Sequence, residues 1–294
     1  MTILQFTGAF ELGLIYGLVA LGVFITFRVL NFPDLTVDGS FPLGAAVSIS
    51  LISSGIDPLI ATLSAVVAGC LTGVATGILT TRFKVLDLIS GIITMTALYS
   101  INIRVMQGRP NISILDQQTF VGMLKFFMMP YLGEFSLVVI LGTLVTTIIF
   151  VTYLFLSSEF GLALRATGNN ARMARANGIS DHLMILVGLA ISNGLIALGG
   201  SLFAQENGFS DVNMGIGTII AGFASVILGE AICPARRLKF QLMACIIGAI
   251  TYRSVVAIAL NGSDFGLEAT DLNLVTAVIL ALALIYPRLK GQKQ

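Results

Sequence analysis

The chain of 294 residues is 56% hydrophobic and only 11% charged, and its formal net charge is +1 at pH 7. About a quarter of the residues of a soluble domain are charged, so this composition excludes a soluble globule and predicts a chain dissolved in lipid. The small net charge offers no field that would recruit nucleic acid. The single histidine, His182, excludes a histidine-based metal cluster, and the unpaired spacing of Cys70, Cys233 and Cys245 favours packing roles over a disulfide or metal site.

Nine apolar runs approach the length of roughly 20 residues that a membrane-spanning helix needs. The first is long enough to span and lacks a basic leader and a small-residue cleavage site, so we expect it to be retained and not removed as a signal peptide. The second contains Pro42 and a polar start, which is compatible with a broken or re-entrant helix as well as a full span. In chain order the runs cover 9–30, 36–54, 58–81, 86–106, 135–156, 183–205, 214–232, 240–260 and 271–287.

The positions of Lys and Arg predict the orientation, because cytoplasmic loops of membrane proteins carry the excess of positive charge. If the N-terminus is outside, the outer segments hold only Arg104, Arg109 and Lys125. The cytoplasmic segments then hold Arg28, Arg82, Lys84, Arg165, Arg172, Arg175, Arg236, Arg237, Lys239, Arg288, Lys290 and Lys293. We therefore expect nine membrane crossings, an N-terminus outside, a cytoplasmic C-terminus and an extracytoplasmic segment at 107–134, all within one domain, 1–294.

An internal repeat relates the two halves of the chain at an offset of 177 residues. The run Gly-Leu-Val-Ala-Leu-Gly at 17–22 matches Gly-Leu-Ile-Ala-Leu-Gly at 194–199, and Phe-x-Asp recurs at 32–34 and 209–211. The two copies cross the membrane in opposite directions under the predicted topology. The sequence thus predicts an all-α bundle in which spans 1–4 and 6–9 form an inverted repeat, an arrangement typical of transport folds with broken helices beside the solute path.

Polar residues concentrate at two equivalent breaks between apolar runs, at 31–40 in the first half and at 207–213 in the second. One interpretation makes the first break, 31–40, a capped turn in which Asp34 precedes the next helix. The other places both breaks along a translocation path, with Asp34 and Asp38 on one helical face if that segment is helical. The candidate path residues are Asn31, Asp34, Asp38, Ser40, Asn207, Asp211 and Asn213.

Three ionisable residues fall within or near the predicted spans, where an isolated charge is costly. Glu11 and Glu230 lie near span ends, from which their carboxylates can reach the interface. Arg253 lies deeper. A bundle-facing ion pair and a contact with solute both remain open for Arg253.

The segment 157–182 has the features of a capped helix that docks on another surface. Asn169 or Asn170 can act as N-cap, residues 171–176 are strong helix formers, and Gly178 suits the position after the C-cap. Such a helix is too short to be stable alone, so we expect it to dock on another subunit or on the lipid surface. Arg172 and Arg175 are three residues apart and would share one face.

The run from Gly161 to Ile179 resembles the coupling loop of ATP-binding-cassette (ABC) importer permeases of the branched-chain amino acid and ribose type. The segments 34–46 and 271–277 are similar to a branch of that family that takes up aromatic amino acids such as tryptophan. The resemblance implies a cytoplasmic loop inserted into a separate ATPase, an extracytoplasmic solute-binding protein and a second permease copy, in a homodimer. It implies ATPase-coupling roles for Gly161, Arg165, Gly168, Asn169, Asn170, Arg172, Arg175 and Gly178.

The resemblance also implies a transport subunit and not an enzyme. The chain has no Gly-x-x-x-x-Gly-Lys-Ser/Thr loop, so ATP and Mg²⁺ would be bound by the partner ATPase and no cofactor by this chain. A stand-alone carrier driven by Na⁺ or H⁺ is the alternative, because it shares inverted repeats and acidic residues at helix breaks. An intramembrane enzyme is a weaker alternative, since no Ser/His, metal-ligand or paired-carboxylate site is evident within the spans.

Overall fold

A computed structural model describes residues 3–114, 117–234, 237–261, 277–278 and 281. In this part of the chain, seven helical segments are long and apolar enough to cross a membrane. They correspond to α1 (Ile3–Val23), α3 (Pro58–Thr81), α4 (Asp87–Val105), α6 (Ser136–Ser157), α9 (Asp181–Asn207), α10 (Thr218–Ile232) and α11 (Leu238–Asn261). The second predicted span is a shorter helix, α2 (Val37–Ser53), and the ninth, 271–287, lies almost wholly outside the described residues.

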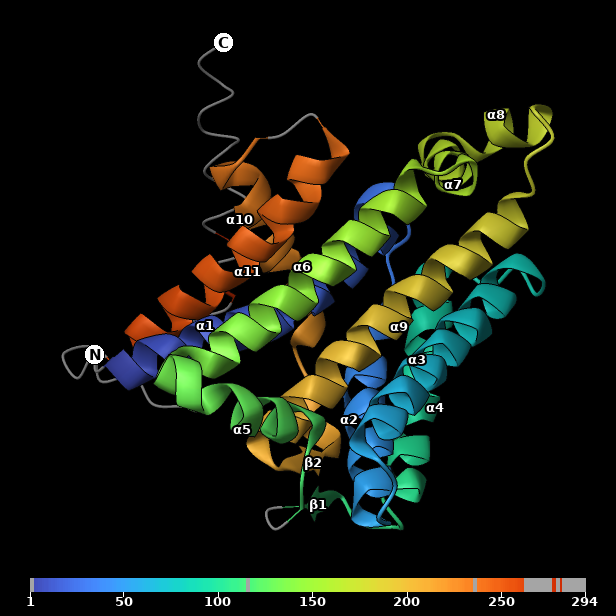
Figure 1. Cartoon of the computed structure of the whole chain (residues 1–294). Helices are drawn as coiled ribbons and strands as arrows, with labels where there is room; N and C mark the ends of the chain where they lie inside the picture. Colours follow the sequence, from blue (N-terminus) through green and yellow to red (C-terminus); the bar gives the residue numbers. More distant parts are fainter. Residues whose placement is uncertain (1–2, 115–116, 235–236, 262–276, 279–280, 282–294) are drawn as a thin grey trace.

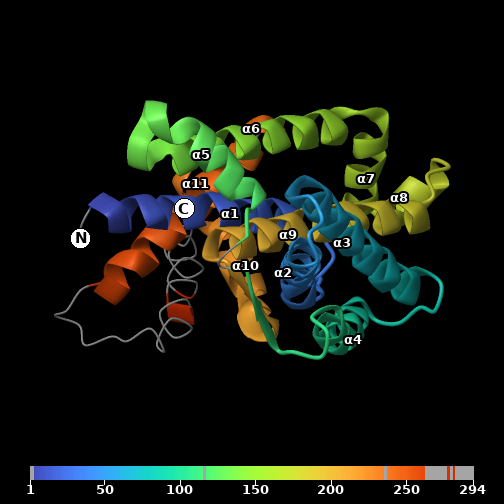
Figure 2. The ribbon, with the colours of Figure 1, turned by 60° about the horizontal axis from the view of Figure 1, so that its bottom comes forward.

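The bundle has two distinct ends (Figure 1). At one end, α7 (Glu159–Asn169) and α8 (Ala171–Ala176) project beyond the long helices; we call this the α7–α8 end. At the other, β1 (Asn111–Ser113) pairs antiparallel with β2 (Phe209–Asp211), and the apolar helix α5 (Phe120–Leu132) continues through η2 (Gly133–Phe135) into α6. Figure 2 shows α1, α9 and α2 between α6 on one side and α4 on the other.

The segment between α4 and α6 departs from the sequence prediction in two respects. The all-α prediction omitted the short β1–β2 pair, in which Asn111 lies opposite Asp211. The segment 107–134 was expected only to be extracytoplasmic, but it contains α5, which packs on α6 and α9 at the β1–β2 end. Pairing of β1 with β2 therefore connects this segment to the second repeat break, 207–213. The sequence did not predict this contact, because the two strands are about 100 residues apart in the chain.

The inverted repeat is present in the packing. Adding 177 to the bounds of α1, α2 and α3 gives 180–200, 214–230 and 235–258, which overlap α9, α10 and α11. The two halves interlock, because α9 packs against α2 and α3 whereas α1 packs against α10 and α11. The matched glycines mark equivalent crossings. A Cβ on Gly17 would lie 2.8 Å from Ile246 of α11, and one on Gly194 would lie 2.7 Å from Cys70 of α3.

Candidate functional site

The first repeat break is held by a buried network of hydrogen bonds. Asp34 is 2% exposed, and its carboxylate accepts from the backbone N–H of Thr36 at 2.9 Å and from the Asn193 amide at 2.8 Å. Asn193 in turn accepts from the Ser40 hydroxyl at 2.7 Å, and Ser40 meets Thr72 of α3 at 2.9 Å. Burial raises the pKa of Asp34, and the hydrogen bonds from Thr36 and Asn193 oppose that rise. The network joins α2, α3 and α9 into one unit.

Asp38 makes a different contact, across the interface between the halves. Its two carboxylate oxygens accept from the backbone N–H groups of Ile219 at 2.7 Å and Gly217 at 3.3 Å, at the start of α10. A carboxylate at this position satisfies free N–H groups and complements the positive end of the helix dipole. The first turn of α2 thus caps α10, the equivalent helix of the second half. The chain enters these two helices from opposite ends of the bundle, and their first turns meet.

The same local turn precedes the second helix of each half. Oδ1 of Asp34 accepts from the N–H two residues later, on Thr36, at 2.9 Å. Oδ1 of Asp211 accepts from the N–H two residues later, on Asn213, at 2.7 Å. These turns occupy equivalent positions at the offset of 177, and each reverses the chain before a shortened helix. They show that the Phe-x-Asp match in the sequence corresponds to the same local structure in both halves.

The structure corrects the expected relation between the two carboxylates of the first break. Because α2 begins at Val37, Asp34 lies before the helix, and the spacing of four residues does not put it on one face with Asp38. Thr36 takes the N-cap position that was considered for Asp34, and its side chain makes no capping bond. Asn31 has φ of 54° and is exposed, and Asn207 is exposed at the opposite end of the bundle.

The helix expected at 171–176 is present as α8. The Asn170 side chain accepts from the Met173 N–H at 3.1 Å, which makes Asn170 and not Asn169 the N-cap. Gly178 follows the helix with φ of 81°, a left-handed conformation that glycine adopts without strain. Arg172 is exposed, whereas Arg175 contacts Asp181 at the start of α9 at 3.5 Å. The loop is therefore anchored to α9 through Arg175.

The loop contains a second helix, α7, that the sequence analysis missed. Ser158 caps it by accepting from the Gly161 N–H at 3.3 Å, a serine signal that was visible in the sequence. Gly161 and Gly168 lie inside α7. A Cβ on Gly168 would lie 1.9 Å from the Val29 carbonyl oxygen. This contact seats α7 directly on η1, the π-helical turn Phe24–Val29 that continues α1.

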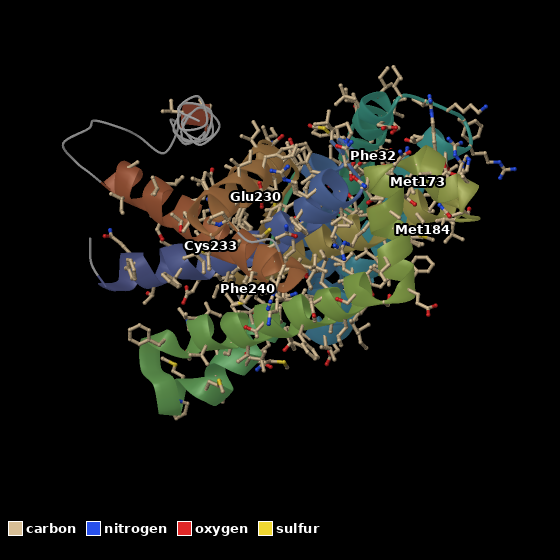
Figure 3. All side chains as sticks on the ribbon, turned by 90° about the horizontal axis from the view of Figure 1, so that it is seen from above. Phe32, Met173, Met184, Glu230, Cys233 and Phe240 are labelled. Atoms are coloured by element: carbon tan, nitrogen blue, oxygen red, sulfur yellow. The ribbon has the colours of Figure 1, made fainter. Side chains whose placement is uncertain are left out.

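The intramembrane charges have partners that only the fold reveals. Glu230, at the end of α10, forms an ion pair with Arg28 of η1 and so links the two halves at the α7–α8 end. Figure 3 looks down on that end and shows Glu230 on α10 beside the end of α1. The guanidinium carbon of Arg253 lies 3.5 Å from the centroid of the Tyr16 ring. Among the described residues, no carboxylate pairs with Arg253.

Glu11 belongs to a cluster near the β1–β2 end. Its carboxyl group lies close enough to interact with that of Glu206 of α9, and Lys125 of α5 lies close enough to act on both groups. The cluster connects α1, α9 and α5. Neither Glu206 nor Asn193 was selected from the sequence, although both are polar residues within or at the edge of an apolar run, which is the signal that could have found them.

The sequence profile described as branched-chain amino acid transport system, permease component, matches residues 6–286. The chain belongs to this permease family. A tyrosine transport system permease protein of Clostridioides difficile is 40% identical over 267 residues, which is 91% of this permease and 86% of the relative. An uncharacterized protein of Rickettsia prowazekii is 35% identical over 94% of this permease and 95% of its own length. A ribose import permease protein of Bacillus subtilis is 24% identical over 94% and 82% respectively.

Membership of this family decides between the alternatives left open by the sequence. The permease is a membrane-spanning subunit of an ABC transporter and not itself an enzyme, and the family works with an ATPase and a solute-binding protein. It is a multi-span protein of the inner membrane. The expected resemblance is confirmed, and the readings as an ion-driven carrier or an intramembrane enzyme are set aside.

Proposed function

We propose that the permease imports an amino acid with an aromatic side chain. The observation that carries this proposal is the 40% identity to a tyrosine transport system permease protein over 91% of the chain. The ribose permease is far less similar, at 24%. The solute would be delivered by an extracytoplasmic binding protein.

The α7–α8 end is the cytoplasmic end in this proposal, with the N-terminus of the chain outside and the C-terminus inside. The excess of Lys and Arg in the segments at that end supports this orientation. The working unit would be a homodimer, since one chain already contains both halves of the repeat and a second copy can complete a symmetric pair. ATP and Mg²⁺ would be bound by the ATPase subunits alone.

The α7–α8 hairpin is the proposed contact with the ATPase. Its tip is exposed: Met173 is 65% exposed, and Arg172 is exposed as well. At its base, Gly168 seats α7 on η1 and Arg175 holds α8 to α9. A displacement of the hairpin by the ATPase would therefore act on α1 and α9, the first helices of the two halves.

The broken segments are the proposed flanks of the solute path. Backbone groups freed by a helix break are tolerable at membrane depth only where they face protein or a water-filled cavity. The contact of Asp38 with the start of α10 joins the two halves at this point, and Asp211 takes the equivalent place to Asp34. Asn31, Ser40, Asn207 and Asn213 would line or support the same region.

Co-expression of the permease with its ATPase tests the proposal. Arg172→Glu should reduce the amount of ATPase that co-purifies with the permease, because it reverses a charge at the exposed tip. Gly178→Val should do the same, since a β-branched residue is strained at φ of 81°. Arg104→Glu, an exposed arginine near the β1–β2 end, is the matched control. Wild-type co-purification of both hairpin variants would refute the coupling role.

The solute is tested separately on the binding protein. Isothermal titration with the twenty amino acids and with ribose should show tight binding of an aromatic amino acid. Tight binding of ribose alone would refute the proposed solute and leave the ATPase result standing.

A further inference from the structure

A polar pocket of about 590 Å³ opens at the α7–α8 end, where the two halves of the repeat meet. One wall is η1, the second is the last turn of α7, and the third is formed by the end of α10 and the start of α11. Its volume lies within the roughly 300–1,000 Å³ typical of small-molecule sites. Residues of the α7–α8 hairpin and of the first break line the pocket, but neither assignment gives it a ligand.

The charges of the pocket do not balance. Arg28, Arg165 and Glu230 all line it. Arg28 pairs with Glu230 across the interface between the halves, whereas no carboxylate pairs with Arg165 among the described residues. Two guanidinium groups and one carboxylate leave one positive charge, which favours a ligand carrying a carboxylate.

Glu230 restricts the choice of anion. A phosphate or sulfate would gain from the arginines but would also face the Glu230 carboxylate at close range, which is unfavourable. A ligand that carries an ammonium group as well as an anionic group can form an ion pair with this carboxylate. The amide side chains of Asn31 and Asn169 line the same pocket and supply neutral oxygen acceptors. A zwitterion therefore matches the pocket better than a simple anion does.

The same pocket offers an aromatic wall. Phe24 and Phe27 line it, and the Phe27 ring is held edge-on to Phe223 of α10 with centroids 4.7 Å apart. The aromatic ring of a ligand packs well against a phenylalanine ring that is fixed in this way. Guanidinium, carboxylate and rings together match the three parts of an aromatic α-amino acid.

We propose that this pocket is an exit-side binding site for an aromatic amino acid, with its carboxylate on Arg165, its ammonium on Glu230 and its ring against Phe24 and Phe27. The choice of amino acid rests on the proposed function. Because Glu230 also holds Arg28, the ligand competes with the Arg28–Glu230 pair that links the halves. Occupation of the site thus loosens the contact between η1 and α10.

Binding of radiolabelled L-tyrosine to the permease–ATPase complex in nanodiscs, without binding protein, tests the site. We expect saturable binding that is weakened at least tenfold by Arg165→Gln and by Glu230→Gln. Arg165→Lys should retain part of the affinity because it keeps the charge. Arg82→Gln, an exposed arginine of the α3–α4 turn outside the pocket, should bind as the wild type does.

Competitors test the chemistry of recognition. Tyramine lacks the carboxylate, 3-(4-hydroxyphenyl)propionate lacks the ammonium and inorganic phosphate lacks both ammonium and ring, so each should displace tyrosine at least tenfold less well than unlabelled tyrosine does. Displacement by phosphate as effective as by tyrosine would overturn the proposal in favour of a simple anion site. Since Arg165 is exposed, its replacement should fold, so unchanged binding by Arg165→Gln would also overturn it.

The outcome is separable from that of the proposed function. If the binding protein selects an aromatic amino acid and the complex shows no saturable tyrosine binding, only the exit-side site is refuted. If the binding protein selects another class of solute, the proposed solute is wrong, and the exit-side assignment is refuted with it.

Discussion

The capping of α10 by Asp38 allows a quantitative prediction for Asp38→Asn. The aspartate accepts from two backbone N–H groups, at 2.7 and 3.3 Å. Asparagine keeps one acceptor for Ile219, but its NH₂ group then faces the N–H of Gly217. Hydrogen bonds to charged groups contribute about 1.5–3 kcal/mol, so losing one and weakening the other should lower the free energy of unfolding by about 2 kcal/mol. That corresponds to roughly a 30-fold change in the folding equilibrium.

Asp57→Asn is the matched control for this prediction. Asp57 caps α3 by accepting from the Leu59 N–H at 2.8 Å, but it does so at an exposed helix end. Asparagine and aspartate are nearly equivalent as exposed N-caps, so we expect a change below about 0.5 kcal/mol. Titration of the purified permease with sodium dodecyl sulfate, followed by circular dichroism, measures both variants. Equal destabilisation by the two substitutions would refute the reasoning that the inter-half contact matters more than an ordinary cap.

Three further predictions follow from the repeat and the loop. Asp34→Asn should lower the free energy of unfolding by about 2–3 kcal/mol, because the new side-chain amide faces the amide of Asn193, its buried partner. Asp211→Asn should lower the free energy of unfolding by less than about 1 kcal/mol. Equal losses for the two variants in the same detergent titration would contradict this prediction. Gly168→Ala should lower the free energy of unfolding by about 1–3 kcal/mol and reduce ATPase co-purification, because its Cβ would meet a backbone carbonyl at 1.9 Å. Gly142→Ala, which has open space around its Cβ, should change neither quantity. A single cysteine at Asn170 in a cysteine-free background should react with an impermeant thiol reagent only in inside-out vesicles, and labelling in intact cells would reverse the proposed orientation.

Much of the architecture could be predicted because lipid imposes a simple rule on the chain. Every backbone group in the membrane must be satisfied within its segment, so a long apolar run has to be a helix. The run 58–81 is α3 without a change of boundary, and 86–106 differs from α4 by one residue at each end. Helix caps could be predicted equally well: Asn170 caps the start of α8, and Gly178 follows its end, as expected. The repeat was also visible, since seven of the 21 residues from 17 to 37 recur at the offset of 177.

The partners of the polar residues could not be predicted in this way, because they lie far apart in the chain. Asp38 and Ile219 are separated by 181 residues, and Arg28 and Glu230 by 202. A carboxylate in the sequence indicates only that a partner is needed, since an unpaired charge in a membrane is costly. Which partner it finds depends on how the two halves interlock, with α9 against α2 and α3 and α1 against α10 and α11. The sequence by itself determined the helices, the repeat and the capped loop; only the packing of one half into the other decided that Asp38 caps α10, that α7 rests on η1 and that three charges and two rings converge on one pocket.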